Sequence, residues 1–265
     1  MINIGINGVC GRMGLRIAGL VAENENMKLV TALEMEGHPD MGKDLSSVIG
    51  QGYDGVRILH EFSDSPDVLI DFTTPASTMA RLKYCVDNGV AVVIGTTGLD
   101  SEQKGEINKA SEKIPCLFSP NMSIGVNLLF NLAETVSKIL GDESDIEIIE
   151  SHHRLKKDAP SGTALKIAEK ICSATNRKMD DVVIYGRKGL TGERPKDQIC
   201  IHSIRSGDIV GEHTITFCSG GERLELVHKA QTRDSFAIGA VRAAKFLYGK
   251  PPGFYSMEDA LRDKC

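Results

Sequence analysis

The chain lacks the marks of membrane, exported and nucleic-acid-binding proteins. None of its 265 residues belongs to an apolar run that approaches the roughly 20 residues needed to span a bilayer. Its first residues have neither the charged nor the apolar region of a signal peptide. Acidic residues outnumber basic ones, 36 to 31, so there is no overall basic field for nucleic-acid phosphates. We expect a cytoplasmic protein with neither a nucleic-acid nor a membrane partner.

Cysteine is present without a pattern. The seven cysteines form no C-x-x-C pair and no regular spacing, which argues against a disulfide framework or a zinc site. We expect most of them to be buried as small apolar residues. The adjacent His152 and His153 would point to opposite faces of a strand and would not easily share one ion. The sequence therefore predicts no metal site.

The first half of the chain alternates strand-like apolar runs with helix-like periodicity, a pattern that predicts a Rossmann-type doubly wound parallel sheet. Residues 36–66 are Gly-, Asp- and Ser-rich and predict long connections around one short helix or strand. The predicted strands are 2–7, 28–33, 68–72, 90–94 and 114–118, and the predicted helices are 15–23, one from Pro75 through Cys85, and 101–113.

The first strand ends in a glycine motif, Gly8-Val-Cys-Gly-Arg-Met-Gly14, which leads into a helix. Glu34 ends the next strand, twenty residues after Gly14, where a dinucleotide fold places an acid for the ribose hydroxyls. The alternative is a turn that needs glycine only for its backbone geometry. Strand ends gather along one edge of a parallel sheet, so cofactor contacts are expected at Gly8, Val9, Cys10, Gly11, Arg12, Met13, Glu34, Gly95, Thr96, Thr97, Ser119, Pro120, Asn121 and Met122.

The second half predicts an α+β domain with a mostly antiparallel sheet. Short turns at 206–208 and 219–221 separate strand-like runs, which favours antiparallel pairing of consecutive strands. The Gly- and charge-rich loop 186–195 is either a mobile lid or a solvated connection. Predicted helices are 124–140, 162–172 and 235–248, with strands at 145–151, 182–185, 198–205, 210–217 and 222–230 and a short final segment at 257–261.

A basic stretch, residues 152–157, precedes a predicted helix start at Ser161-Gly-Thr163. A helix N-terminus offers free backbone N–H groups to an anion, and the basic run adds charge, so the pair predicts a small dicarboxylate ligand. The alternative is a solvated basic loop. Beside a dinucleotide domain, the arrangement suggests hydride transfer, with His152 as general acid or base and Lys156 as a charge or proton donor. The alternative for His152 is a structural histidine.

Six short motifs are spread along the chain: Gly8-x-x-Gly-Arg-Met-Gly14, Ile94-Gly-Thr-Thr-Gly98, Asn121-x-Ser-x-Gly-Val-Asn127, Glu150-x-His-His-Arg-x-Lys156, Asp158-Ala-Pro-Ser-Gly-Thr-Ala164 and Arg205-x-Gly-Asp-Ile-Val-Gly-Glu-His213. Together they resemble the motifs of the 4-hydroxy-tetrahydrodipicolinate reductase (dihydrodipicolinate reductase) family. The resemblance runs essentially end to end. It implies reduction of a cyclic dicarboxylate to tetrahydrodipicolinate with NADH or NADPH, in lysine and diaminopimelate biosynthesis.

The resemblance also implies residue roles and an architecture. His152 would be the proton donor or acceptor and Lys156 a proton donor, while His153, Gly162 and Thr163 would contact substrate. Residues 1–123 would bind the dinucleotide, with 234–265 returning to that domain. Residues 124–233 would bind substrate and build a homotetramer.

Two positions depart from many family members. Leu155 stands where many have a third histidine, and Met35 stands where some have an arginine that can hold the 2′-phosphate of NADP. Because Glu34 repels that phosphate, we predict that NADH is used at least as well as NADPH. Two other functions stay open: a different two-domain dehydrogenase of amino-acid metabolism, and a dinucleotide sensor without turnover.

Overall fold

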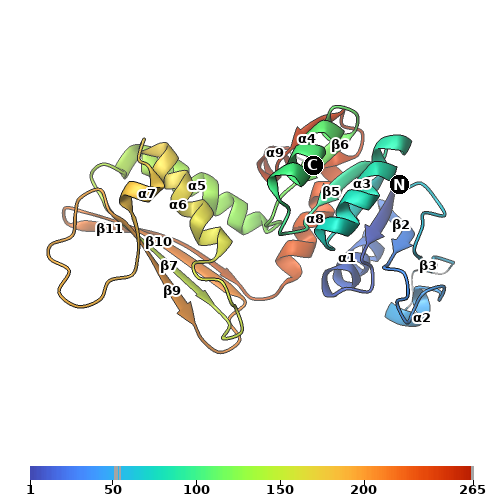
Figure 1. Cartoon of the computed structure of the whole chain (residues 1–265), viewed down its shortest axis with the longest axis horizontal. Coiled ribbons are helices and arrows are strands. Elements are labelled where there is room, and N and C mark those ends of the chain that lie inside the picture. Colours follow the sequence, from blue (N-terminus) through green and yellow to red (C-terminus); the bar gives the residue numbers. More distant parts are fainter. Residues whose placement is uncertain (51–52, 54, 264–265) are drawn as a thin grey trace. The chain divides into compact units, whose positions relative to one another are not determined.

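The computed structural model describes residues 1–50, 53 and 55–263. It separates into two compact units, residues 1–124 with the segment from Asp234 onward, and residues 125–233 (Figure 1). Among the described residues, no helix combines the length and apolarity that crossing a bilayer requires. Cys85, Cys116, Cys172 and Cys200 are buried, Cys10 and Cys218 are half-buried, and Cys265 lies outside the described residues.

The first unit is built on a seven-stranded, all-parallel sheet with the order β12-β6-β5-β4-β1-β2-β3. The sequence pattern identified five of these strands. It predicted one short helix or strand within residues 36–66, where the structure has both a short helix and the two-residue β3, and it missed β12, which is too short to show a period. The strands are β1 (Ile2–Asn7), β2 (Met27–Leu33), β3 (Ile58–Leu59), β4 (Val68–Asp71), β5 (Ala91–Ile94), β6 (Pro115–Phe118) and β12 (Gly253–Tyr255).

Helices pack on both faces of this sheet because successive strand residues point to opposite sides. On one face Ile4 and Ile70 pack with the buried residues of α1 and α8, and on the other Leu69 and Val92 pack with those of α3 and α4. The doubly wound prediction is therefore confirmed. The helices are α1 (Arg12–Ala22), α2 (Ser46–Ile49), α3 (Pro75–Asn88), α4 (Ser101–Ser111), α8 (Asp234–Leu247) and α9 (Met257–Arg262).

The second unit has a five-stranded sheet with the order β11-β10-β7-β9-β8. Its helices lie over one face only, and Ile148, Ile167 and Phe217 are among the residues buried between the two layers (Figure 1). The elements are α5 (Ile124–Leu140), β7 (Asp145–His152), α6 (Gly162–Ala174), α7 (Met179–Val182), β8 (Val183–Tyr185), β9 (Ile199–Arg205), β10 (Gly211–Ser219) and β11 (Glu222–Ala230).

The pairing of consecutive strands in this sheet was predicted only in part. β10 and β11 form the expected antiparallel hairpin, but β7 lies between β9 and β10, so those two strands are not partners. The sheet is mixed, because β7–β9 and β8–β9 pair in parallel. The short 206–210 connection crosses the end of β7, where Ser206 N donates to the carbonyl of His152 (2.9 Å) and Arg154 N to that of Gly207 (3.1 Å).

Candidate functional site

The glycine turn after β1 brings the chain close to itself. Gly8 has a φ of +78°, which favours glycine, and a Cβ on Gly14 would lie 2.1 Å from the carbonyl oxygen of Gly8. Helix α1 therefore starts directly against the turn. The positive φ of Gly8 and the lack of a Cβ at Gly14 let the backbone of the turn approach a pyrophosphate at the helix N-terminus.

Glu34 at the end of β2 reaches this turn. Its Oε2 accepts a hydrogen bond from the backbone N–H of Cys10 (3.1 Å), and its Oε1 accepts one from Met35 N (2.9 Å). The structure thus brings together the turn residues and the acid that the sequence paired with them. Met35 is 67% exposed and leaves the outer side of Glu34 open.

A buried carboxylate, Asp71, joins the ends of three neighbouring strands at the same edge. Oδ1 of Asp71 accepts from the hydroxyls of Thr73 (2.6 Å) and Thr96 (3.1 Å), and Oδ2 accepts from the side-chain amide of Asn7 (3.0 Å). Burial raises the pKa of Asp71, and the hydrogen bonds from Thr73, Asn7 and Thr96 oppose that rise. The network fixes the β4 and β5 strand ends beside the glycine turn of β1.

Not every residue predicted at this edge points outward. The side chains of Val9 and Met122 are buried, and the hydroxyl of Thr96 is bonded inward to Thr73 N (3.0 Å), Thr78 and Asp71. Such residues can meet a ligand through their main chain. Ser119 is buried as well, and its hydroxyl donates to the carbonyl of Asn121 (2.7 Å) within the same loop.

In the second unit a buried carboxylate, Glu150, organises the end of β7. Its side chain is inaccessible to solvent and receives two hydrogen bonds from Arg205 (2.7 and 2.8 Å) and one from the backbone N–H of Ser161 (3.1 Å). Burial alone would raise its pKa, but the hydrogen bonds, led by that from Arg205, lower the pKa of Glu150 to about 2. Glu150 is therefore ionised at neutral pH.

Glu150 also determines how His152 is held. The Nδ1 atom of His152 lies 2.6 Å from Glu150 Oε2, so Nδ1 carries the proton and Nε2 is the nitrogen left for a ligand. Burial lowers the pKa of His152, with Glu150 opposing the shift. A Cβ at Gly211 would lie 3.1 Å from Nε2, so the glycine on β10 leaves room for the ring.

The N-terminus of α6 lies next to this pair, because Ser161 N is bonded to Glu150. Ser161 caps the helix by accepting from Ala164 N (3.1 Å), and its hydroxyl also contacts Nε2 of the buried His213 (3.1 Å). Gly162, the first residue of the helix, is exposed, and Thr163 is half-buried. Backbone N–H groups at such a terminus favour an anion.

The basic residues of the stretch 152–157 differ in their exposure to solvent. The side chain of Lys156 is 21% exposed, and its Nζ forms an ion pair with Asp158 (2.9 Å). Arg154 and Lys157 are exposed. The Nδ1 atom of His153 is buried without a hydrogen-bond partner among the described residues, as are the Nδ1 atoms of His213 and His228.

Comparison with known proteins decides the family. Models of the dihydrodipicolinate reductase N-terminus and C-terminus match residues 2–122 and 125–261. The 4-hydroxy-tetrahydrodipicolinate reductases of Syntrophobacter fumaroxidans and Syntrophus aciditrophicus are each 46% identical over 264 residues, covering 98% of this chain and 99% and 98% of those proteins. The chain belongs to the dihydrodipicolinate reductase family.

A solved structure agrees with this membership. The dipicolinate-bound dihydrodipicolinate reductase from Paenisporosarcina sp. TG-14 has a TM-score of 0.77 and 30% identity, with 98% of each chain covered. An amine dehydrogenase from Mycobacterium smegmatis, at 12% identity and a TM-score of 0.60, shares the fold alone. The chain is an NAD(P)H-dependent oxidoreductase, and the nicotinamide-binding fold of its first unit was predicted correctly.

Sequence reasoning gave no role to three residues of this reductase site: Glu150, Arg205 and His213. One signal was available. In β7, Glu150 shares the face of Ile146 and Ile148, so strand alternation places a charge at a core position. A carboxylate at such a position requires a partner. No comparable signal in the sequence joins Arg205 or His213 to it, because both lie on other strands.

Proposed function

We propose that this chain reduces 4-hydroxy-tetrahydrodipicolinate to tetrahydrodipicolinate with a nicotinamide cofactor, in the lysine and diaminopimelate pathway of the cytoplasm. The observation that carries the proposal is the Glu150–His152 pair beside the N-terminus of α6. Glu150 fixes the tautomer of His152 and also binds the backbone N–H of Ser161, which places the anion-binding N-terminus of α6 next to the pair. An acid–base step on a carboxylate substrate requires a positioned histidine next to an anion site. The relatives' name and the dipicolinate-bound neighbour supply the substrate class, a cyclic dicarboxylate.

In this proposal the cofactor supplies the hydride, and the protein manages the protons, including the one with which the 4-hydroxyl leaves as water. His152 exchanges a proton through Nε2, because Glu150 occupies Nδ1. Lys156 donates a proton as its Nζ leaves Asp158 for the substrate. His152 is the last residue of β7 and Lys156 lies in the segment that connects β7 to α6, so one short stretch carries the proton chemistry.

The substrate carboxylates fit two kinds of donor. Backbone N–H groups of Gly162 and Thr163 at the start of α6 receive one carboxylate. The Nδ1 atom of His153, the residue after β7, has no hydrogen-bond partner among the described residues, and we propose that it donates to the substrate.

We assign the dinucleotide to the sheet edge of the first unit. The contacts are the turn Gly8–Met13, Glu34, Gly95–Thr97 and Ser119–Met122, with Glu34 accepting from the ribose hydroxyls and Asp71 fixing the edge. Because Glu34 is followed by Met35 and not by a basic residue, we propose that NADH is used at least as well as NADPH. Residues 1–123 and 234–265 carry this site, and 124–233 the substrate site.

We further propose a homotetramer built through the uncovered face of the second sheet. Ile149, Ile204 and Val227 lie on that face and are 37%, 46% and 50% exposed. Apolar side chains gathered on a sheet face need a partner surface. Light scattering of wild type and Ile204→Glu tests the assembly, and a wild-type monomer would overturn it.

A coupled assay tests the reaction. Aspartate semialdehyde, pyruvate and the preceding synthase generate the substrate, and NADH absorbance reports turnover. We expect oxidation of NADH only when synthase and this chain are both present. Oxidation with aspartate or homoserine as substrate would identify another dehydrogenase. Binding of NADH without turnover on any of these substrates would identify a sensor.

A further inference from the structure

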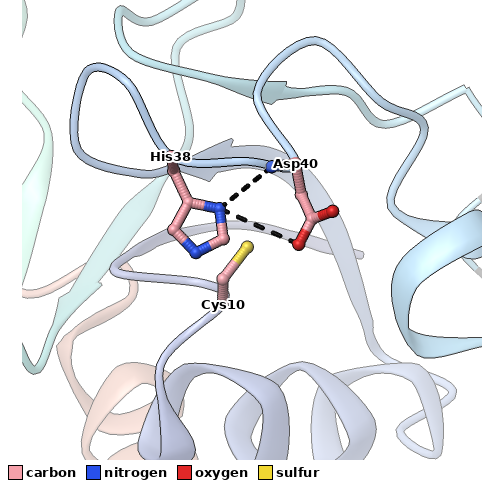
Figure 2. A group of neighbouring side chains, drawn as sticks. All are labelled: Cys10, His38 and Asp40. Atoms are coloured by element: carbon pink, nitrogen blue, oxygen red, sulfur yellow. Dashed lines mark hydrogen bonds and ion pairs between the residues drawn. The ribbon is translucent and has the colours of Figure 1, made fainter.

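Three side chains with metal-binding atoms meet beside the glycine turn: Cys10, His38 and Asp40 (Figure 2). Cys10 lies in the turn after β1, and the other two lie in the loop after β2. Their ligand atoms are all within 4.8 Å of one another, and His38 Nδ1 lies 3.8 Å from Asp40 Oδ2. Two separate loops thus place a thiol, an imidazole and a carboxylate around one point.

The distances suit a small divalent ion of intermediate softness. Zn²⁺ binds sulfur at ~2.3 Å and nitrogen or oxygen at ~2.0–2.2 Å, so its ligands lie roughly 3–4 Å apart. The cluster needs only a small contraction to reach that spacing. The side chains of His38 and Asp40 are 26% and 28% exposed, which leaves a path for the ion and room for a water as fourth ligand.

The surrounding charge also favours a cation. The carboxylates of Glu34 and Asp40 lie close enough to the Cys10 sulfur to give the site a negative local charge. Lys43 binds Oδ1 of Asp40 (2.6 Å) and leaves Oδ2 directed at His38. When Zn²⁺ binds, the S–H bond breaks, the proton passes to solvent, and a sulfur–metal bond forms. His38 gives up the weak contact of Nδ1 with Asp40 N (3.2 Å).

A second group of residues with metal-binding atoms is less suited to hold a cation. Glu147, Cys200 and His202 also come within 4.8 Å of one another. There, however, Arg187 and Arg194 bind the carboxylate of Glu147 at 2.8 to 3.2 Å. Two guanidinium groups repel a divalent ion, whereas among the described residues the Cys10 cluster carries one bound cation, Lys43 on Oδ1 of Asp40.

We propose that Cys10, His38 and Asp40 form a Zn²⁺ site whose occupation excludes the dinucleotide. The backbone N–H of Cys10 is bonded to Glu34, the residue assigned to the cofactor ribose, so a metal held by Cys10 sits next to that residue and competes with the ribose for the space. The exclusion rests on the proposed function, whereas metal binding does not. The sequence gave no sign of this site, because its ligands have no motif spacing.

Cobalt(II) is the probe, because a cobalt–thiolate bond gives an absorption band that oxygen and nitrogen ligands do not. We expect one Co²⁺ per chain with this band, displaced by Zn²⁺. Cys10→Ser should abolish the band, and His38→Ala and Asp40→Asn should weaken binding by more than about tenfold, the loss that even an outer partner of a metal site causes. Cys218→Ser, at another half-buried thiol, and His202→Ala, in the second cluster, are the matched controls and should retain it.

Two further measurements separate the site from the proposed function. NADH fluorescence without metal reports the dinucleotide site alone, and its failure would count against the proposed function. Titration of NADH into the cobalt complex should remove the band, and Zn²⁺ should raise the KM for NADH in wild type but not in His38→Ala. No thiolate band, or a band that survives Cys10→Ser, overturns the site. A band unaffected by bound NADH overturns the exclusion.

Discussion

The Nδ1 atom of His152 and the Oε2 atom of Glu150 are joined by a 2.6 Å hydrogen bond in which the carboxylate is wholly buried. Arg205 and the backbone of Ser161 hold the same carboxylate, so three elements orient one imidazole. This relationship positions His152, in contrast to the exposed Arg154 and Lys157 of the same basic stretch. It also leads to the first two predictions.

Glu150→Gln should lower kcat while leaving the Kd for NADH nearly unchanged. The amide can donate to Nδ1 and so stabilise the wrong tautomer of His152, the effect that follows loss of an orienting carboxylate elsewhere. Glu147→Gln is the matched control, because Glu147 lies on the same strand, facing the other side, and also binds arginine and histidine. Equal losses of kcat in the two variants would show a general effect on the sheet and contradict a specific role.

His152→Ala should reduce kcat by roughly 10²–10⁴, the usual contribution of a positioned acid or base. Cofactor binding should stay close to that of wild type, because the hydrogen bonds between the glycine turn and Glu34 do not involve His152. Steady-state kinetics with NADH fluorescence titration measures both. Lys157→Ala, an exposed neighbour in the same basic stretch, serves as control. A rise in KM alone would make His152 a binding residue.

Met35→Arg should shift cofactor preference toward NADPH. An arginine at this exposed position can pair with the 2′-phosphate and offset the repulsion from Glu34. An exposed ion pair contributes up to ~1 kcal/mol, so the ratio of kcat/KM for NADPH and NADH should rise by up to about fivefold. Met35→Gln controls for loss of the methionine. A wild-type enzyme with a large NADPH preference would contradict the premise.

Acid should destabilise the protein in two steps. The pKa of His213 is lowered from 6.5 to about 3, chiefly by burial. Between these two values the unfolded chain binds a proton at this histidine and the folded chain does not. The stabilising effect of His213 is complete above pH 6.5 and declines as the pH falls toward 3. Glu150, with a pKa lowered from 4.5 to about 2, loses its effect as the pH falls from 4.5 toward 2.

Urea unfolding at a series of pH values measures both steps. His213→Gln should flatten the slope of the unfolding free energy between pH 6.5 and 4.5, by at most about 1.4 kcal/mol per pH unit. The slope below pH 4.5 should remain. His202→Gln controls for removal of a more exposed histidine. An unchanged slope in His213→Gln would contradict the assignment.

Much of this protein follows from local sequence. The periodicity of residues 124–140 matches α5, and Thr74-Pro75 starts α3 as a cap followed by proline. The spacing between Gly14 and Glu34 predicted that Glu34 lies near the glycine turn. In the structure, Glu34 accepts a hydrogen bond from a backbone N–H of that turn. These features could be predicted because periodicity, capping and βα spacing act over a few residues along the chain.

Contacts between distant residues were decided only by the tertiary structure. β7 lies between β9 and β10, and this order depends on which strands pack their isoleucines into the same core. The length of the turn between β9 and β10 does not indicate that order. The bonds of Glu150 with Arg205, and of Ser161 with His213, link residues 55 and 52 positions apart. The sequence by itself predicted the dinucleotide fold and the segment around His152 as a candidate acid–base site. Only the tertiary structure decided which charged residues lie together: the hydrogen bonds from Arg205 keep the buried Glu150 ionised, and Glu150 in turn fixes the tautomer of His152.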